Sequence, residues 1–211
     1  MPEASCEALL RSGIDKLQLD LGEDRFQQLL AYHRLLQDWN KAYNLTSIRD
    51  PEQMIVRHLL DSLSVVHCIR EDQVLDLGTG AGLPGLVLAI VYPEKNYQLL
   101  DSNGKKTRFI NQVKIDLGLK NVTVAKSRAE TYQPQPICQA VTSRAFATLS
   151  DSIALLSNLL MVGGRFYAMK AKLLDQELKD LPSTYSLEKT QPINVPFLAE
   201  DRHLVIIKRL D

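Results

Sequence analysis

Residues 74–85 read Val-Leu-Asp-Leu-Gly-Thr-Gly-Ala-Gly-Leu-Pro-Gly, and this stretch decides the fold. An apolar run ends at Asp76, and three glycines follow at alternate positions, Gly78, Gly80 and Gly82, before a second apolar run begins. Glycine adopts backbone conformations that other residues avoid, so a strand can turn tightly here into a helix and bring bare N–H groups against a ligand. The stretch therefore predicts a cofactor-binding loop between a strand and a helix.

Two nucleotide-binding patterns overlap in this loop. Counted from Gly80, it fits the G-x-G-x-x-G pattern of dinucleotide sites, with Asp101 following 21 residues later as a ribose-binding acid. Counted from Asp76, it reads D-x-G-x-G-x-G. A carboxylate so close would repel a pyrophosphate but suits a ligand with a positive end, such as S-adenosylmethionine with its ammonium and sulfonium groups. The loop favours this methyl donor, and a nicotinamide dinucleotide or a plain glycine turn are the alternatives.

The composition indicates a globular protein with one main core. The 211 residues are 45% hydrophobic and 24% charged, and the formal net charge is zero, so any contact with a nucleic acid must come from a local basic cluster. The three cysteines lie far apart without a C-x-x-C pair or a histidine cluster, which predicts neither a metal site nor a disulfide framework. The N-terminus does not resemble a signal peptide, and no apolar run is long enough to span a bilayer.

The chain divides near residue 70 into two parts with different patterns of apolar residues. Residues 1–70 read as helices only, with apolar residues at helical spacing from Phe26 to Leu36 and a second helix opening at Asp50-Pro51. In residues 71–211, short apolar runs alternate with helical patterns, which indicates crossover connections on a parallel sheet. Strands are expected near 73–77, 97–101, 122–126, 138–143, 163–169, 184–190 and 203–209, and helices near 84–92, 105–118, 148–160 and 171–180.

The last two expected strands are joined without a clear helical pattern, which favours a hairpin at the edge of the sheet. Four or five parallel strands followed by a hairpin is the layout of Rossmann-like, class I S-adenosylmethionine-dependent methyltransferases. The predicted fold class is therefore α/β, with a methyltransferase sheet in residues 71–211 and an N-terminal helical segment in residues 1–70.

Candidate site residues follow the expected strands, because ligands of open α/β sheets bind beyond the carboxyl ends of the strands. Asp101 ends the second strand and would accept hydrogen bonds from ribose hydroxyls, or else cap the next helix. Ala129 and Glu130 follow the third strand, where backbone N–H groups would border an adenine, and Glu130 would be either a ligand group or a solvated surface charge. Arg144 ends the fourth strand, where methyl donor and acceptor should meet, and it would hold a phosphate or guanine O6, or else form a structural salt bridge.

The segment Ser143-Arg-Ala-Phe-Ala147 lacks two motifs that would indicate particular methyl acceptors. Enzymes that methylate amino groups typically carry Asp/Asn-Pro-Pro-aromatic here, and enzymes that methylate C5 of pyrimidines carry a cysteine nucleophile. This chain has neither device at this position. An acceptor that already has a free lone pair, such as guanine N7, needs neither, and its catalysis would be mostly alignment of the two reactants.

Basic residues gather between positions 104 and 130. Seven lysines and arginines stand there against two acidic residues, for a net charge of +5. Lys105 and Lys106 occupy the first turn of an expected helix, where the helix dipole disfavours cations, and Lys170 follows the fifth strand on the same rim. We interpret these residues as a phosphate-binding surface, with a solvated helix face as the alternative.

Several segments together resemble one family, the ribosomal RNA small subunit methyltransferases G, also called glucose-inhibited division protein B. They are Trp39–Thr46, His58–Ser62, Gly78–Gly85, Asp101–Lys106, Arg128–Glu130 and Ser143–Ala147. The resemblance implies a bacterial, cytoplasmic enzyme. We expect a monomer without a metal. It would transfer a methyl group from S-adenosylmethionine to N7 of a guanine in 16S ribosomal RNA, in the small subunit or its assembly intermediate. An RNA-binding assembly factor that uses its donor pocket weakly is the alternative.

The resemblance also implies roles for residues. Donor contacts are expected at Gly78, Leu83, Ala129, Glu130 and Arg144, with Gly80, Gly82 and Asp101 completing the cofactor site and Arg144 as the catalytic residue. Asn40, Lys41 and Asn44, beside Trp39, become candidates for RNA binding together with Lys105, Lys106 and Lys170, because amide, cation and aromatic groups suit an unpaired base. The alternative is a helix end that packs Trp39 on the sheet, with Asn44 as its cap.

Overall fold

The computed structural model of this chain describes residues 2–144, 148–171 and 181–211. It begins with two helices, α1 (Pro2–Lys16) and α2 (Glu23–Tyr43), and α2 contains the apolar spacing from Phe26 to Leu36 that predicts a helix. A third helical stretch is built from α3 (Pro51–Met54), a π-helical segment η1 (Ile55–Leu60) and α4 (Asp61–Leu63). The Asp50 side chain accepts a hydrogen bond from Gln53 N, so the predicted cap at Asp50-Pro51 is confirmed.

A seven-stranded sheet follows, in the order β3-β2-β1-β4-β5-β7-β6. The first five strands are parallel, and β7 runs antiparallel between β5 and β6. This confirms the predicted parallel sheet and terminal hairpin. The strands are β1 (Gln73–Leu77), β2 (Asn96–Asp101), β3 (Val122–Lys126), β4 (Cys138–Arg144), β5 (Leu160–Lys170), β6 (Tyr185–Pro192) and β7 (His203–Arg209).

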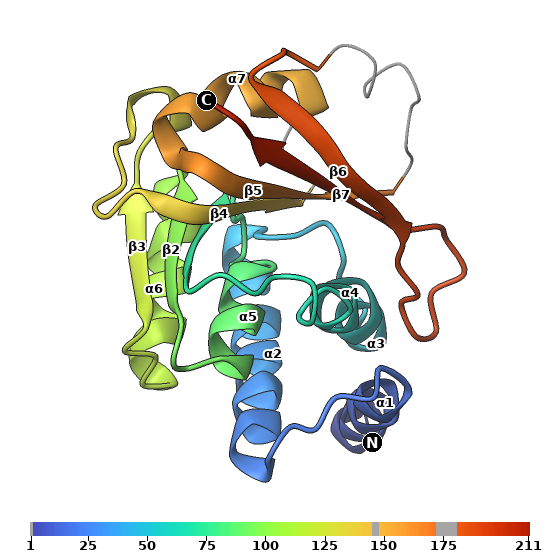
Figure 1. The fold of residues 1–211 in the computed structure, drawn as a ribbon. Coiled ribbons are helices and arrows are strands. Elements are labelled where there is room, and N and C mark those ends of the chain that lie inside the picture. Colours follow the sequence, from blue (N-terminus) through green and yellow to red (C-terminus); the bar gives the residue numbers. More distant parts are fainter. Residues whose placement is uncertain (1, 145–147, 172–180) are drawn as a thin grey trace.

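Helices cover both faces of the sheet (Figure 1). The helices α2, α5 (Gly85–Val91) and α6 (Gly104–Asp116) lie on one face, and α7 (Leu149–Leu159) lies on the other. A short 3-10 turn, η2 (Ala129–Thr131), follows β3. The expected helix 171–180 falls on residues outside the described part of the chain, except for Ala171.

One of the expected element boundaries is wrong. The sequence predicts a helix to residue 160 and a strand from 163, whereas α7 ends at Leu159 and β5 begins at Leu160. Leu160 already pairs with Cys138 of β4, and the register shifts before Ala140 pairs with Arg165. The strand tolerates Gly163, whose φ of 80° lies in the left-handed region, at this irregularity.

The helical segment and the sheet share a core. One cluster of buried apolar side chains joins Leu29 of α2, Leu59 of η1, Leu86 of α5 and Leu204 of β7. A second cluster packs α7 against the other face through Leu156 and Phe166. The first cluster crosses the predicted boundary near residue 70, so the N-terminal helices are buried against the sheet and help to position its loops. No helix of the described residues is long and apolar enough to cross a membrane.

The strand order creates a switch point between β1 and β4. The chain leaves β1 toward β2 and β3 on one side, and β4 and β5 lie on the other. Connections then diverge at the carboxyl ends of these two strands, and ligands of doubly wound sheets bind in the crevice that results. Gly78 and Arg144 stand at this edge, since β1 ends at Leu77 and β4 ends at Arg144.

Candidate functional site

The glycine loop between β1 and α5 has the backbone that its sequence predicts. Gly78, Gly80 and Gly82 have φ angles of 67°, 62° and 94°, in the left-handed region that residues with a Cβ rarely enter. The buried Tyr32 of α2 donates its hydroxyl to the carbonyl of Ala81, at 2.9 Å. The loop is therefore shaped by its glycines and supported from the N-terminal helices.

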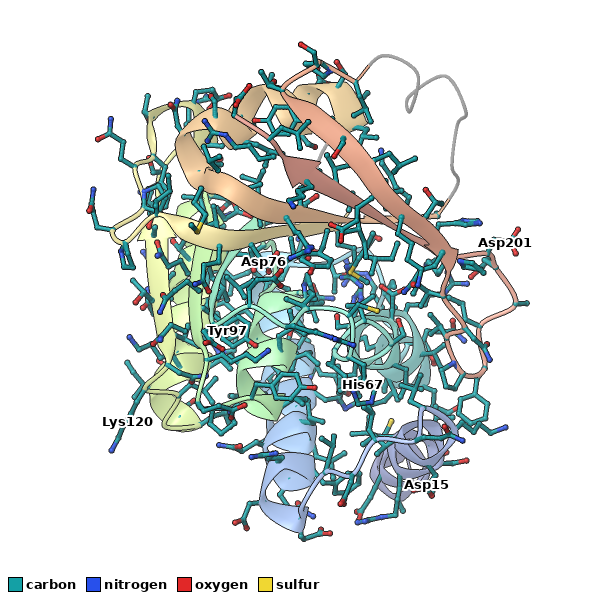
Figure 2. The ribbon with its side chains drawn as sticks, in the orientation of Figure 1. Asp15, His67, Asp76, Tyr97, Lys120 and Asp201 are labelled. Carbon is teal, nitrogen blue, oxygen red and sulfur yellow. The ribbon has the colours of Figure 1, made fainter. Side chains whose placement is uncertain are left out.

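Asp76 lies beneath this loop. Its side chain is fully buried, at the centre of the molecule (Figure 2). Its Oδ2 accepts hydrogen bonds from the Thr79 hydroxyl and from Gly85 N, at 2.8 Å for the latter. Burial raises the pKa of this carboxyl to about 6. Asp76 thus fixes both ends of the loop from inside, a role that the sequence-based argument about a positively charged ligand did not foresee.

Asp101 ties the end of β2 to the same loop. Its Oδ2 accepts from Gly80 N at 3.0 Å, its Oδ1 accepts from Asn103 N at 2.8 Å, and Lys106 Nζ lies 3.6 Å from Oδ2. The cap of α6 is Asn103, whose side chain accepts from Lys105 N. The predicted alternative of Asp101 as the cap is therefore wrong, because Asn103 is the residue that directly precedes the first helical residue, Gly104.

Two clefts meet above the carboxyl ends of the strands. The smaller, of about 340 Å³, contains Asp101, Ala129 and Glu130, and the larger, of about 620 Å³, contains Gly80, Leu83, Arg144 and Lys170. Both are lined by Gly78 and Lys106. The two clefts together form one trough, and most of the predicted cofactor residues line it. Gly82 shapes the loop without lining either cleft.

Arg144 is held in the larger cleft by the N-terminal helical stretch. Its Nη1 donates to the carbonyl of Arg57 at 2.8 Å and to Asp61 Oδ2 at 3.0 Å. The other oxygen of Asp61 accepts from Arg202 Nε at 3.1 Å. The salt bridge that the sequence left as an alternative for Arg144 is present, and it joins a second arginine in the same cleft.

His58 completes this part of the cleft. Its Nε2 lies 2.9 Å from the Thr46 hydroxyl, and its Nδ1 lies 3.4 Å from Arg144 Nη2. Burial and the neighbouring Arg144 lower the pKa of the imidazole to about 4, so the ring is neutral at pH 7. His58, Asp61 and Arg202 are site residues that the sequence did not predict. The pattern His58-Leu-Leu-Asp61-Ser marked a family resemblance, but nothing in its spacing indicated contacts with Arg144 or Arg202.

The predicted RNA-binding residues separate into two groups. Asn40 is buried, its Nδ2 donates to Ile48 O, and its Oδ1 accepts from Thr46 N, so it closes a turn and is not placed to contact RNA. Asn44 ends α2 in the left-handed conformation and is exposed, as is Lys41, which pairs with Asp38. The ring of Trp39 stacks on Tyr43 and packs against Phe109.

These contacts favour the alternative of a packed helix end, with Trp39 on a ring of α6 in place of the sheet and Asn44 as the cap. Of the three predicted lysines, Lys106 and Lys170 line the larger cleft. Lys105 is exposed in the first turn of α6, beside Lys106 in the sequence, and lines neither cleft. The cationic rim predicted from the sequence is therefore assembled around one edge of the sheet.

A family model for rRNA small subunit methyltransferase G matches residues 25–205. The chain belongs to this family. Its relatives of that name include a Marinomonas sp. protein, 48% identical over 200 residues that cover 95% of this chain and 96% of the relative. A Marinobacter nauticus protein of the same name is 48% identical over 203 residues, covering 96% and 94% of the two chains. The resemblance noted from the sequence segments is thus confirmed.

Solved structures share the fold of this methyltransferase G family member at low sequence identity. An S-adenosylmethionine-dependent methyltransferase from Aquifex aeolicus superposes with a TM-score of 0.58 at 18% identity, covering 78% of this chain and 96% of that one. A chain of the fibrillarin/Nop5p complex gives a TM-score of 0.55 at 16% identity, covering 73% and 82%. These likenesses confirm the Rossmann-like methyltransferase fold. Within the described residues, no cluster of His, Cys, Asp and Glu is arranged to hold a metal.

Proposed function

We propose that this chain transfers a methyl group from S-adenosylmethionine to N7 of one guanine in 16S ribosomal RNA of the small ribosomal subunit. Membership of the methyltransferase G family supports the reaction class and the ribosomal RNA substrate. The observation that carries the proposal is the meeting of two unlike clefts at Gly78 and Lys106. One cleft contains the carboxylate of Asp101, and the other is lined by five cations.

The residues present fit S-adenosylmethionine. The smaller cleft offers Asp101 and the backbone around Ala129 and Glu130 to an adenosine, while Gly78 and Leu83 border the larger cleft on the side of the glycine loop. Asp76 lines neither cleft, so its carboxylate would act on the cofactor through the glycine loop that it holds in place. When bound, the cofactor supplies an electrophilic methyl group on a positively charged sulfur.

The residues around Arg144 are suited to bind and orient the acceptor. Guanine N7 has a lone pair and no proton to remove, so the chain needs no general base. His58 is neutral at pH 7 and therefore adds no further positive charge beside Arg144. Arg144 and Arg202 present guanidinium groups that match a phosphate or a guanine edge. Holding the acceptor in line with the donor can lower the barrier by up to about 7–11 kcal/mol in favourable cases.

The ribosomal RNA partner would lie along the cationic rim. Lys106 and Lys170 line the larger cleft and Lys105 precedes Lys106 in the first turn of α6, while the chain as a whole has a formal net charge of zero. A local rim on a neutral protein binds RNA weakly in general, so recognition of the target would depend on shape within the small subunit or its assembly intermediate. We propose that the chain acts there as a cytoplasmic monomer without a metal.

The test is transfer of a tritiated methyl group from S-adenosylmethionine to small subunits that lack the modification. Label at one guanine, located by aniline cleavage and primer extension, is the expected result. Arg144→Ala should lower transfer by about 100-fold, because the acceptor loses its orienting cation in a reaction that depends on alignment. Arg11→Ala, on the exposed surface of α1, should leave transfer unchanged. Absence of transfer to naked RNA, assembly intermediates and mature subunits alike would contradict the proposal.

A further inference from the structure

The carboxylate of Asp61 bridges two arginines from distant parts of the chain. Its side chain is 3% exposed at the start of α4. One oxygen accepts from Arg144, at the end of β4, and the other accepts from Arg202, just before β7. Each of the two arginine side chains is about one-fifth exposed and lines the larger cleft. A single buried charge therefore sets the positions of both arginines at the place where the acceptor is expected.

Asp61 is also the only carboxylate among the described residues that line the larger cleft. Five cations line the same cleft, so its formal charge is five minus one, or +4. They are Arg57, Lys106, Arg144, Lys170 and Arg202. Lys106 and Arg57 have acidic partners, Asp101 and Glu200, outside this lining. The two arginines on Asp61 have their anionic partner inside the cleft.

This charge balance matters because the cleft must serve two ligands of opposite character. A nucleic-acid backbone is attracted by guanidinium groups, whereas the sulfonium of the methyl donor is repelled by them. Partly buried charges interact through an effective dielectric far below that of water and are poorly screened by salt. A fixed carboxylate between the two arginines lowers the potential at the donor without removing the groups that bind the acceptor.

We propose that Asp61 is a charge-compensating positioning residue, which holds Arg144 and Arg202 for the acceptor and offsets their charge toward the donor's sulfonium. The inference rests on the proposed function, since it requires a positively charged methyl donor. It predicts that Asp61 helps the chain to distinguish S-adenosylmethionine from its spent product, S-adenosylhomocysteine, which lacks the methyl group and the positive charge on sulfur.

The test is the ratio of the two dissociation constants, measured by titration calorimetry. In Asp61→Asn, S-adenosylmethionine should bind about tenfold more weakly, while binding of S-adenosylhomocysteine should change by less than about twofold. A merely structural role would weaken both ligands by the same factor. Equal losses, or no change in either constant, would overturn the proposal.

Glu200→Gln is the matched control. It removes the same unit of charge from the exposed ion pair with Arg57, where the Glu200 side chain is 49% exposed and solvent screens the charge. The ratio of dissociation constants should stay at the wild-type value. An equal shift in Glu200→Gln would overturn the proposal, because net charge and not the position of Asp61 would then be responsible.

Two further variants separate charge from position. Asp61→Glu keeps the charge but moves it by one methylene, so the ratio should be retained while kcat falls through misplaced guanidinium groups. Arg202→Gln removes one cation and should shift the ratio in favour of S-adenosylmethionine, which keeps the proposal testable if Asp61→Asn fails to fold. An unchanged ratio in Arg202→Gln would contradict the proposal.

Failure of the proposed function and failure of this inference give different results. If the wild-type chain binds neither ligand, the proposed function fails. If it binds both and the variants leave the ratio of dissociation constants unchanged, this inference alone fails.

Discussion

At the scale of single residues, Gly85 is required by the packing of its neighbour. A Cβ placed there would lie 2.7 Å from Asp76 Oδ2 and 3.0 Å from Leu99 Cγ. These atoms belong to a buried carboxylate and a core side chain, so neither can move away cheaply. Gly85 is the last glycine of the dinucleotide pattern read from the sequence. In the structure it leaves space for the Asp76 side chain at the start of α5.

Gly85→Ala should lower the free energy of unfolding by about 1–3 kcal/mol, because the extra methyl group overpacks the site beneath the loop. Urea denaturation monitored by circular dichroism measures this. The control is Gly22→Ala, since nothing lies within 4 Å of a Cβ at Gly22, and its stability should change by less than about 0.5 kcal/mol. Equal effects of the two substitutions would contradict the packing argument.

Asp76 makes the stability of the protein depend on pH in an unusual direction. Its pKa is about 6 in the folded protein and 3.8 for an ordinary aspartate, so between these limits the folded state retains a proton that the unfolded chain has lost. The free energy of unfolding then falls as pH rises through this range, by an amount on the order of 3 kcal/mol for this group. His58 acts in the opposite sense, since its pKa of about 4 lies below the ordinary value of 6.5.

Asp76→Asn removes the titration of this carboxyl and leaves His58 in place. Relative to wild type, the variant should gain stability between pH 4 and pH 6.5, by an amount on the order of 3 kcal/mol, and the difference should be constant above that range. Chemical denaturation of both proteins at several pH values gives the difference directly. A difference that does not vary with pH would show that Asp76 titrates as an ordinary exposed carboxyl.

At the scale of elements, the helical stretch 51–63 supplies one wall of the larger cleft. Its middle is π-helical, and segments of this kind are frequent at functional sites. Arg57 and His58 lie within this segment, and Asp61 follows it at the start of α4. All three line the cleft and contact Arg144. The N-terminal helices are therefore part of the site as well as part of the core.

The helix α2 supports the glycine loop through one buried hydrogen bond. Tyr32→Phe removes the hydroxyl that donates to Ala81 O and leaves that carbonyl without its partner. Unfolding should become easier by about 1–2 kcal/mol, and S-adenosylmethionine should bind more weakly, because the loop is less firmly placed. Denaturation and titration calorimetry check the two effects. Tyr43→Phe, a half-buried ring of the same helix stacked on Trp39, should alter neither; a similar loss there would contradict the specific role of Tyr32.

At the scale of the whole molecule, function depends on where charge is placed and not on how much there is. The formal net charge is zero, yet basic residues collect at the carboxyl edge of the sheet. A chain of this kind should bind RNA through few phosphate contacts. The dependence of its affinity on salt concentration is therefore informative, since each contact contributes a fixed share to the slope.

Lys105→Gln with Lys106→Gln should weaken RNA binding and reduce the slope of log affinity against log salt by about 1 to 2. Fluorescence anisotropy with a 16S rRNA fragment at several salt concentrations measures it. Lys114→Gln with Lys120→Gln is the charge-matched control, with Lys114 in the last turn of α6 and Lys120 just after this helix, at the lower left of Figure 2. The control should leave the slope unchanged, and an equal reduction would place the RNA elsewhere.

The pattern of residues was enough to predict most of the fold. Strand and helix positions, the parallel sheet, the terminal hairpin and the left-handed glycines are encoded by local periodicity and by glycine spacing, which act over short stretches of chain. The meeting of Asp101, Ala129 and Arg144 also followed, because the ends of parallel strands share one edge of the sheet.

The contacts between side chains inside the site could be known only from the tertiary structure. Asp61, Arg144 and Arg202 lie far apart in the sequence, and their meeting depends on how the helical stretch and the β6–β7 connection pack over the end of β4. Asn40, predicted to contact RNA, is buried and closes a turn. Asp76, predicted to face the ligand, is buried beneath the loop and bonds to it. Sequence by itself determined the scaffold and the cofactor loop, because these follow from local conformational preference. Tertiary structure decided which charges face one another, because that depends on contacts between segments that no local pattern records.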